Sequence, residues 1–149
     1  MKPVWISGEC NTTEKLIIAH RGASSYAKEN TIESFKKAML LGADMIEFDV
    51  RRTKDNILIA FHDEMIRGHS VKELTYEAIS QLARNQGFDI PTVEEVLKWS
   101  RGKIRLDVEL KEEASANSRS YFRIAKSGSN VFWGGLSPTP FGVRESQRS

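Results

Sequence analysis

The stretch that decides the fold is residues 16–50, which read LIIAHRGASSYAKENTIESFKKAMLLGADMIEFDV. It begins with a short apolar run, Leu16–His20, that suits a buried strand, and it ends with Met45–Val50, in which apolar and polar residues alternate. Between these runs, Asn30 and Glu33 have the spacing of a helix capping box. Apolar residues then recur at helical spacing, at Ile32, Phe35, Ala38 and Met39. A strand, a helix and a second strand in this order predict a right-handed βαβ unit with parallel strands.

The alternation of strands and helices continues downstream. Apolar runs predict strands at Ile57–His62 and Ile104–Lys111, and helical spacing predicts a helix at Thr75–Ala83. Another helix is predicted to begin at Thr92, which forms a capping box with Glu95. Only about six residues link the predicted strand Met45–Val50 to the predicted strand Ile57–His62. This link is too short for the crossover that joins two parallel strands. Those two strands are therefore either an antiparallel pair or a parallel pair with an unusually tight connection.

Composition describes an ordinary folded chain of 149 residues, with 28% charged and 40% hydrophobic residues. The net charge of +2 gives no reason to expect nucleic-acid binding. The single cysteine, Cys10, excludes an internal disulfide framework, and we expect a reducing, cytoplasmic location. We expect no signal peptide and no transmembrane segment, because no run of about 18 apolar residues occurs.

The last thirty residues differ from the rest in composition. Twelve of them are Gly, Pro or Ser. They include four basic residues and one acidic residue, whereas residues 1–119 include 18 basic and 19 acidic residues. No helical or strand period is sustained there. The sequence therefore predicts a folded domain at 1–119 and an irregular, divergent tail at 120–149.

Three carboxylates lie on predicted strands at positions that could converge. Glu47 and Asp49 share one face of their strand, about 7 Å apart, opposite the apolar residues of that strand. Glu109 occupies the polar face of the strand Ile104–Lys111. Together the three would make an oxygen-rich site for Mg²⁺ or Ca²⁺. The alternative is a pair of amphipathic strands, each with one solvated face.

Two histidines end predicted strands, His20 the first and His62 the third. Ligands of α/β sheets collect at the carboxyl ends of strands, and histidine titrates near neutrality, so the two could share acid and base work. Each is alternatively a structural, hydrogen-bonded residue. Asp63 could orient the His62 imidazole or cap the next loop, and His69 is expected to be a surface residue.

Basic residues beside these groups could bind an anion. Arg21 could hold a phosphate in its fork of donors or form a salt bridge with Glu29. Lys111 could lie beside the same anion or be a counter-ion for Glu109. Metal-assisted hydrolysis of a phosphate ester needs these three kinds of group: carboxylates that bind the cation, basic residues that bind the phosphate, and histidines that transfer protons. The sequence contains no P-loop, GxSxG, HExxH or CxxC motif.

The segment AHRGASSYAKENTIESFKKAMLLGADMIEFDVRRTKDNILIAFHD, with IPTVEEVLKW and LDVELK further on, resembles the glycerophosphodiester phosphodiesterase family. The resemblance covers about residues 16–112. It implies an α/β fold of the TIM (β/α)₈ barrel type and hydrolysis of glycerophosphodiesters to sn-glycerol 3-phosphate and an alcohol. A small-molecule substrate is the expected partner, with Mg²⁺ or Ca²⁺ as cofactor.

The resemblance also implies roles for matching residues. His20 and His62 correspond to the general acid/base pair, and the metal ligands to Glu47, Asp49 and Glu109. Arg21 and Lys111 correspond to phosphate contacts, and Glu29 with Asn30 to the active-site loop. In some similar proteins the strand-end histidine, here His62, lies on the metal as well.

Length separates this chain from a full barrel, which takes about 250 residues. About four strands are recognisable, so we expect an incomplete barrel. Two other functions remain open: phospholipase D-like cleavage of lysophospholipids or sphingomyelin, and an inactive truncated fragment.

Overall fold

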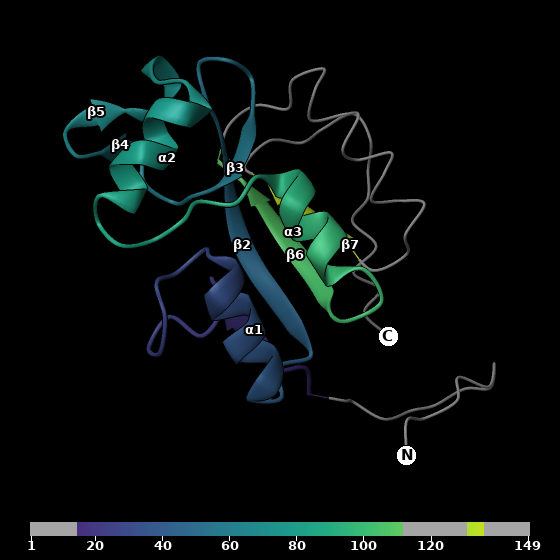
Figure 1. The fold of residues 1–149 in the computed structure, drawn as a ribbon. Helices are drawn as coiled ribbons and strands as arrows, with labels where there is room; N and C mark the ends of the chain where they lie inside the picture. Colours follow the sequence, from purple (N-terminus) through teal and green to yellow (C-terminus); the bar gives the residue numbers. More distant parts are fainter. Residues whose placement is uncertain (1–14, 112–130, 136–149) are drawn as a thin grey trace.

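The computed structural model describes residues 15–111 and 131–135 (Figure 1). Its main sheet contains five strands: β1 (Ile18–His20), β2 (Met45–Arg52), β3 (Leu58–Ala60), β6 (Arg105–Leu110) and β7 (Val131–Gly135). A two-stranded sheet is made of β4 (Met65–Ile66) and β5 (His69–Ser70). The helices are α1 (Ile32–Leu40), α2 (Tyr76–Arg84), α3 (Val93–Ser100) and the 3₁₀ turn η1 (Val71–Glu73).

Four strands of the main sheet are parallel and lie side by side in the order β1, β2, β6, β7. Figure 1 shows β2 beside β6. The helix α1 connects β1 to β2, as the βαβ prediction requires. Register places His20 beside Glu47 and Asp49 beside Glu109. The predicted site residues of these three strands therefore lie at neighbouring positions of one sheet.

The fifth strand, β3, is antiparallel to β2, which resolves the alternative that the sequence left open. β3 pairs only with the end of β2, from Val50 to Arg52, on the edge opposite β6. β1 pairs with the same edge of β2 but reaches only as far as Glu47. The hairpin of β2 and β3 thus extends past the end of β1, and the chain that follows β3 runs back toward the end of β1.

Two apolar cores stabilise the described part of the chain. In the larger core, α1 and α3 (Figure 1) pack against β2 and β6. The rings of Phe35 and Phe48 are in contact there, 5.7 Å apart between centroids. A smaller core lies among β3, β4 and α2 and includes Ile59, Ile66 and Ile79. Burial of this much apolar surface is the main force that keeps the sheet and its helices together.

The polar face of β2 is not solvated, which excludes the amphipathic alternative for this strand. Glu47, Asp49 and Arg51 are exposed by only 8%, 0% and 8%. Buried charges are costly unless they are paired or bind an ion, so this face needs a specific set of partners. β6 differs, because Asp107 and Glu109 are half-buried while Leu106 and Val108 are fully buried.

Helix starts confirm one predicted cap and correct the other. Thr92 and Glu95 form the predicted capping box of α3. The box of α1 lies one residue later than predicted and joins Thr31 to Ser34, not Asn30 to Glu33. A cap residue needs an extended backbone. Asn30 instead has φ 56°, in the left-handed region, and its side chain bonds to Asp49.

The prediction of an irregular tail over 120–149 is wrong at Val131–Gly135. These residues form β7, which pairs parallel with β6 from Leu106 to Leu110. The run is only five residues long and its neighbours are rich in Ser and Gly, so no period was visible in the sequence. The remaining residues of the tail lie outside the described ranges, as does Cys10.

None of the helices in the described ranges combines the length and apolar character that crossing a bilayer requires.

Candidate active site

The loop between β1 and α1 is built around a left-handed turn at Arg21 and Gly22, with φ 58° and 82°. A Cβ on Gly22 would lie 2.8 Å from the carbonyl carbon of Ser34, so only glycine fits there. The loop is held against α1 by the Ala23 N–H, which donates to the Ser34 carbonyl at 3.0 Å. This close approach accompanies the contacts of Arg21 and Asn30 with Asp49 on β2.

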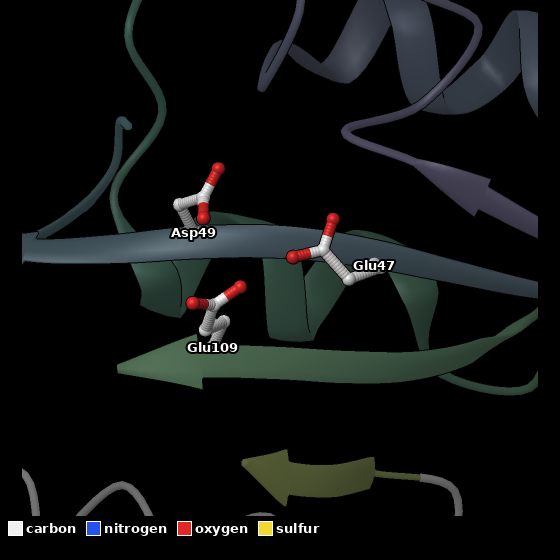
Figure 2. Close-up of side chains that lie close together, drawn as sticks. All are labelled: Glu47, Asp49 and Glu109. Atoms are coloured by element: carbon white, nitrogen blue, oxygen red, sulfur yellow. The ribbon is translucent and has the colours of Figure 1, made fainter. Parts of the chain in front are cut away.

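Three carboxylates converge between β2 and β6. Oxygen atoms of Glu47, Asp49 and Glu109 all lie within 4.8 Å of one another. Figure 2 shows Glu47 and Asp49 on β2 and Glu109 on the neighbouring β6, with the carboxylates directed toward a common region. The prediction that these three residues come together is therefore confirmed as geometry.

Asp49 is the most deeply buried member and lies between two cations. Arg21 Nε is 2.9 Å from its Oδ2 and Lys111 Nζ is 3.1 Å from its Oδ1. Asn30 Nδ2 donates to Oδ2 at 3.2 Å, and the Asp49 N–H donates to Asn30 Oδ1 at 3.2 Å. These partners compensate the buried charge and fix the orientation of the carboxylate.

Glu47 is buried with fewer partners. Its Oε2 accepts from the Arg21 N–H at 3.2 Å and lies 3.6 Å from His20 Nε2. Its buried Oε1 has no hydrogen-bond partner among the described residues. Burial, and then repulsion by Asp49, raise the pKa of Glu47 to about 7.

Lys111 joins the two strands electrostatically. Its Nζ lies 2.7 Å from Glu109 Oε1 as well as near Asp49. Burial lowers the pKa of Lys111, but the contacts with Glu109 and Asp49 outweigh burial and raise it overall. The counter-ion alternative for Lys111 is therefore observed.

Arg21 likewise makes the salt bridge that its alternative interpretation predicted. Its Nη1 is 3.3 Å from Glu29 Oε2 while its Nε contacts Asp49. Glu29 and Asp49 therefore hold the guanidinium from two sides. The side chain of Arg21 is still 20% exposed.

The two histidines differ in their contacts. His20 ends β1 beside Glu47 and its side chain is 67% exposed. His62 follows β3, whose carboxyl end points opposite to that of β2, so strand direction alone would have placed it wrongly. The backbone of His62 is held to β2 by Arg51, whose Nε donates to the His62 carbonyl at 2.7 Å. His62 Nδ1 contacts Asp63 Oδ1 at 2.8 Å, and His69 is exposed, as expected.

Two contacts of this site are not predicted by the sequence. The capping pattern predicts Asn30 as a helix cap and the resemblance implies that it lies in the active-site loop, but neither indicates its two hydrogen bonds to Asp49. The alternation of this strand also predicts Arg51 on the face of Glu47 and Asp49, where the structure has it, but it indicates no contact for this side chain.

The donor set fits a divalent cation. Ligand oxygens on opposite sides of Ca²⁺ can be about 5 Å apart, and on opposite sides of Mg²⁺ about 4 Å, given their usual bond lengths. The separations of up to 4.8 Å among Glu47, Asp49 and Glu109 are close to this range. The unpartnered Oε1 of Glu47 is a second sign, because a buried carboxylate oxygen needs a positive or donating partner. These three residues could hold one Mg²⁺ or Ca²⁺.

Known proteins are similar to this chain in sequence and in fold. The chain matches the glycerophosphoryl diester phosphodiesterase family over residues 20–139. A glycerophosphodiester phosphodiesterase of Caldanaerobacter subterraneus is 45% identical over 95 residues, which cover 56% of this chain and 39% of the relative. The chain spans less than half the length of the first curated relatives it matches, 46% and 39%.

Solved structures agree in fold. The glycerophosphodiester phosphodiesterase of Agrobacterium tumefaciens superposes with a TM-score of 0.73 at 27% identity, covering 83% of this chain and 59% of that one. The corresponding Thermotoga maritima enzyme gives a TM-score of 0.71 at 29% identity, with 85% and 56% covered. The described strands and helices thus form part of an α/β TIM barrel, incomplete as expected. Since the family match extends over more than half of the sequence, the chain belongs to the glycerophosphoryl diester phosphodiesterase family.

Proposed function

We propose that this chain carries the active site of a phosphodiesterase that uses a divalent cation to hydrolyse glycerophosphodiesters to sn-glycerol 3-phosphate and an alcohol. The observation that supports this most is the convergence of Glu47, Asp49 and Glu109 within 4.8 Å. Arg21 and Lys111 lie beside the same carboxylates. Oxygen ligands for a cation and donors for a phosphate thus meet in one place. The names of the relatives point to the same reaction class.

Glu47, Asp49 and Glu109 would hold the cation, Mg²⁺ or Ca²⁺. When bound, such an ion neutralises phosphate charge and lowers the pKa of an attacking water or hydroxyl. Because the pKa of Glu47 is raised to about 7, protons compete with the cation for this ligand. Cation affinity should therefore increase as the pH rises through 7.

His62 and His20 are the proposed proton carriers. Asp63 contacts Nδ1 of His62, which leaves Nε2 of that ring to accept a proton from the nucleophile. His20 extends from the end of β1 with most of its ring exposed, and it would protonate the leaving oxygen. The contact of its Nε2 with Glu47 becomes an ion pair when the imidazole is charged.

Arg21 and Lys111 would bind the phosphate. Glu29 and Asp49 hold the guanidinium of Arg21 from two sides, which orients its remaining donors before substrate arrives. Lys111 is fixed similarly by Glu109 and Asp49. Both residues therefore lose little freedom on binding an anion.

The test is the release of glycerol 3-phosphate from glycerophosphocholine by the EDTA-treated chain, with and without added Mg²⁺ or Ca²⁺. We expect release only with a cation, and none from Glu47→Gln. Product formation that EDTA leaves unchanged would contradict the proposal, as would its absence under every condition. Lysophosphatidylcholine, assayed in parallel, tests the phospholipase D-like alternative. A cooperative thermal unfolding transition without any turnover would favour the inactive-fragment alternative.

A further inference from the structure

Arg51 is a buried charge that the proposed mechanism does not use. It is 8% exposed and occupies the same face of β2 as Glu47 and Asp49, two residues beyond Asp49. Arginine is seldom buried without a specific partner, because removing its charge from water is costly. The position of Arg51 on the acidic face therefore calls for an explanation of its own.

The partner of Arg51 is the backbone of His62. Its Nε donates to the His62 carbonyl oxygen at 2.7 Å, and the described residues offer it no other hydrogen bond or ion pair. The ladder between β2 and β3 pairs Val50 with Ala60, and the Phe61 N–H then donates to the Asp49 carbonyl at 3.0 Å. His62 is the next residue, where regular strand pairing has ended. The side chain of Arg51 thus continues the attachment of β3 to β2 by one residue.

We propose that Arg51 is a positioning residue for His62, an inference that rests on the proposed function of that histidine. Arg51 fixes the peptide that follows His62, and Asp63 fixes Nδ1 of the ring. The backbone contact determines where the side chain leaves the chain, and the ring contact determines how the imidazole is turned. A bond from a charged donor to a carbonyl is short and strong, which suits a contact that must define a position. A displacement of about 1 Å at a reacting group can cost about 100-fold in rate.

Two substitutions distinguish the effect of the Arg51 hydrogen bond from the effects of its charge and its volume. In Arg51→Gln the amide nitrogen occupies the place of Nε along the side chain, so a donor remains without the charge. In Arg51→Met a methyl group occupies that place, so a similar volume remains without the donor. We expect Arg51→Met to lower kcat about 10- to 100-fold with KM changed less than about threefold. We expect Arg51→Gln to stay within about threefold of the unchanged chain.

An unchanged kcat in Arg51→Met would overturn the inference, and so would an equal loss in Arg51→Gln and Arg51→Met. If Arg51→Met does not fold, Arg51→Lys replaces it, because lysine keeps the charge but places a methylene where Nε was. A loss of kcat in Arg51→Lys that Arg51→Gln does not show supports the inference. Equal activity of these two variants contradicts it.

A measurement without substrate separates this inference from the proposed function. In ¹⁵N-histidine NMR spectra of the chain, we expect Arg51→Met to shift or broaden the His62 ring signals, and Arg51→Gln to leave them in place. The ring signals of exposed His69 serve as the control. His62 signals unaffected by Arg51→Met overturn the inference even in a chain without turnover. If the unchanged chain lacks turnover but its His62 signals respond as expected, only the proposed function fails.

Discussion

At the scale of single residues, Glu47 makes the stability of the chain depend on pH. Its pKa is raised from 4.5 to about 7, because burial and the neighbouring Asp49 disfavour the charged form. The folded state therefore binds more protons than the unfolded state between these values, and stability falls as the pH rises through the interval. In EDTA we expect the free energy of unfolding to fall from pH 5 to pH 7.5, by at most about 3 kcal/mol.

Urea unfolding at the two pH values measures this loss. Glu47→Gln should remove most of it, whereas Glu33→Gln, on the exposed side of α1, should keep it. Burial, and then repulsion by Glu109, also raise the pKa of Asp107, and Glu47→Gln leaves this contribution of the same sign in place. A slope equal in Glu47→Gln and in the unchanged chain would refute the role of Glu47.

The histidines carry a second prediction at this scale. His20→Ala and His62→Ala should each lower turnover of glycerophosphocholine by about 10²- to 10⁴-fold, because each removes one proton transfer. Neither residue is among the proposed cation ligands, so binding of Mg²⁺ or Ca²⁺ should survive. His69→Ala is the matched control. Turnover that is unaffected in both variants would remove the acid/base assignment.

At the scale of elements, the β1–α1 loop depends on Gly22. Gly22→Ala requires an unfavourable φ of 82° and brings a methyl group against the backbone of Ser34, so we expect a loss of about 3 kcal/mol or more. Gly42→Ala meets a similar φ of 91° with open space around it and should cost about 1 kcal/mol. Urea unfolding compares the two, and equal losses would mean that the contact with Ser34 is unimportant.

The strands show how far the sequence could predict the site. Alternation at Met45–Val50 and Ile104–Lys111 correctly grouped Glu47, Asp49 and Glu109, because period two and parallel pairing together determine position. For His62 the argument from the sequence is incomplete. The prediction used the carboxyl end of a strand, whereas β3 runs in the opposite direction and returns from beyond β1. The length of a strand, and how far it extends beyond its neighbours, depend on tertiary pairing, which residue patterns do not specify.

The helix caps show the same limit at closer range. Thr92 has no competing partner and caps α3 as its sequence predicts. Asn30 is a good cap residue by type, but Asp49, nineteen residues away, takes its side chain. A long-range partner thus overrides a local preference. The strand β7 was missed because pairing with β6, not an internal pattern, defines it.

At the scale of the whole molecule, the described sheet is the part of a barrel that contains all three proposed cation ligands. They come from the adjacent strands β2 and β6, so a shared cation would tie these strands together directly. A ligand that binds only the folded state stabilises it, by about 2.7 kcal/mol at one hundred times its Kd. The fold and the site thus become linked through one ion.

Calorimetric titration of the EDTA-treated chain with Mg²⁺ and with Ca²⁺ at pH 7.5 tests this claim most directly, with the Glu47→Gln/Glu109→Gln double variant alongside and Glu33→Gln as control. We predict saturable binding of one ion to the unchanged chain and to Glu33→Gln, and none to the double variant. Equal binding by the double variant, or no binding of either ion by the unchanged chain, would contradict a cation shared by Glu47, Asp49 and Glu109.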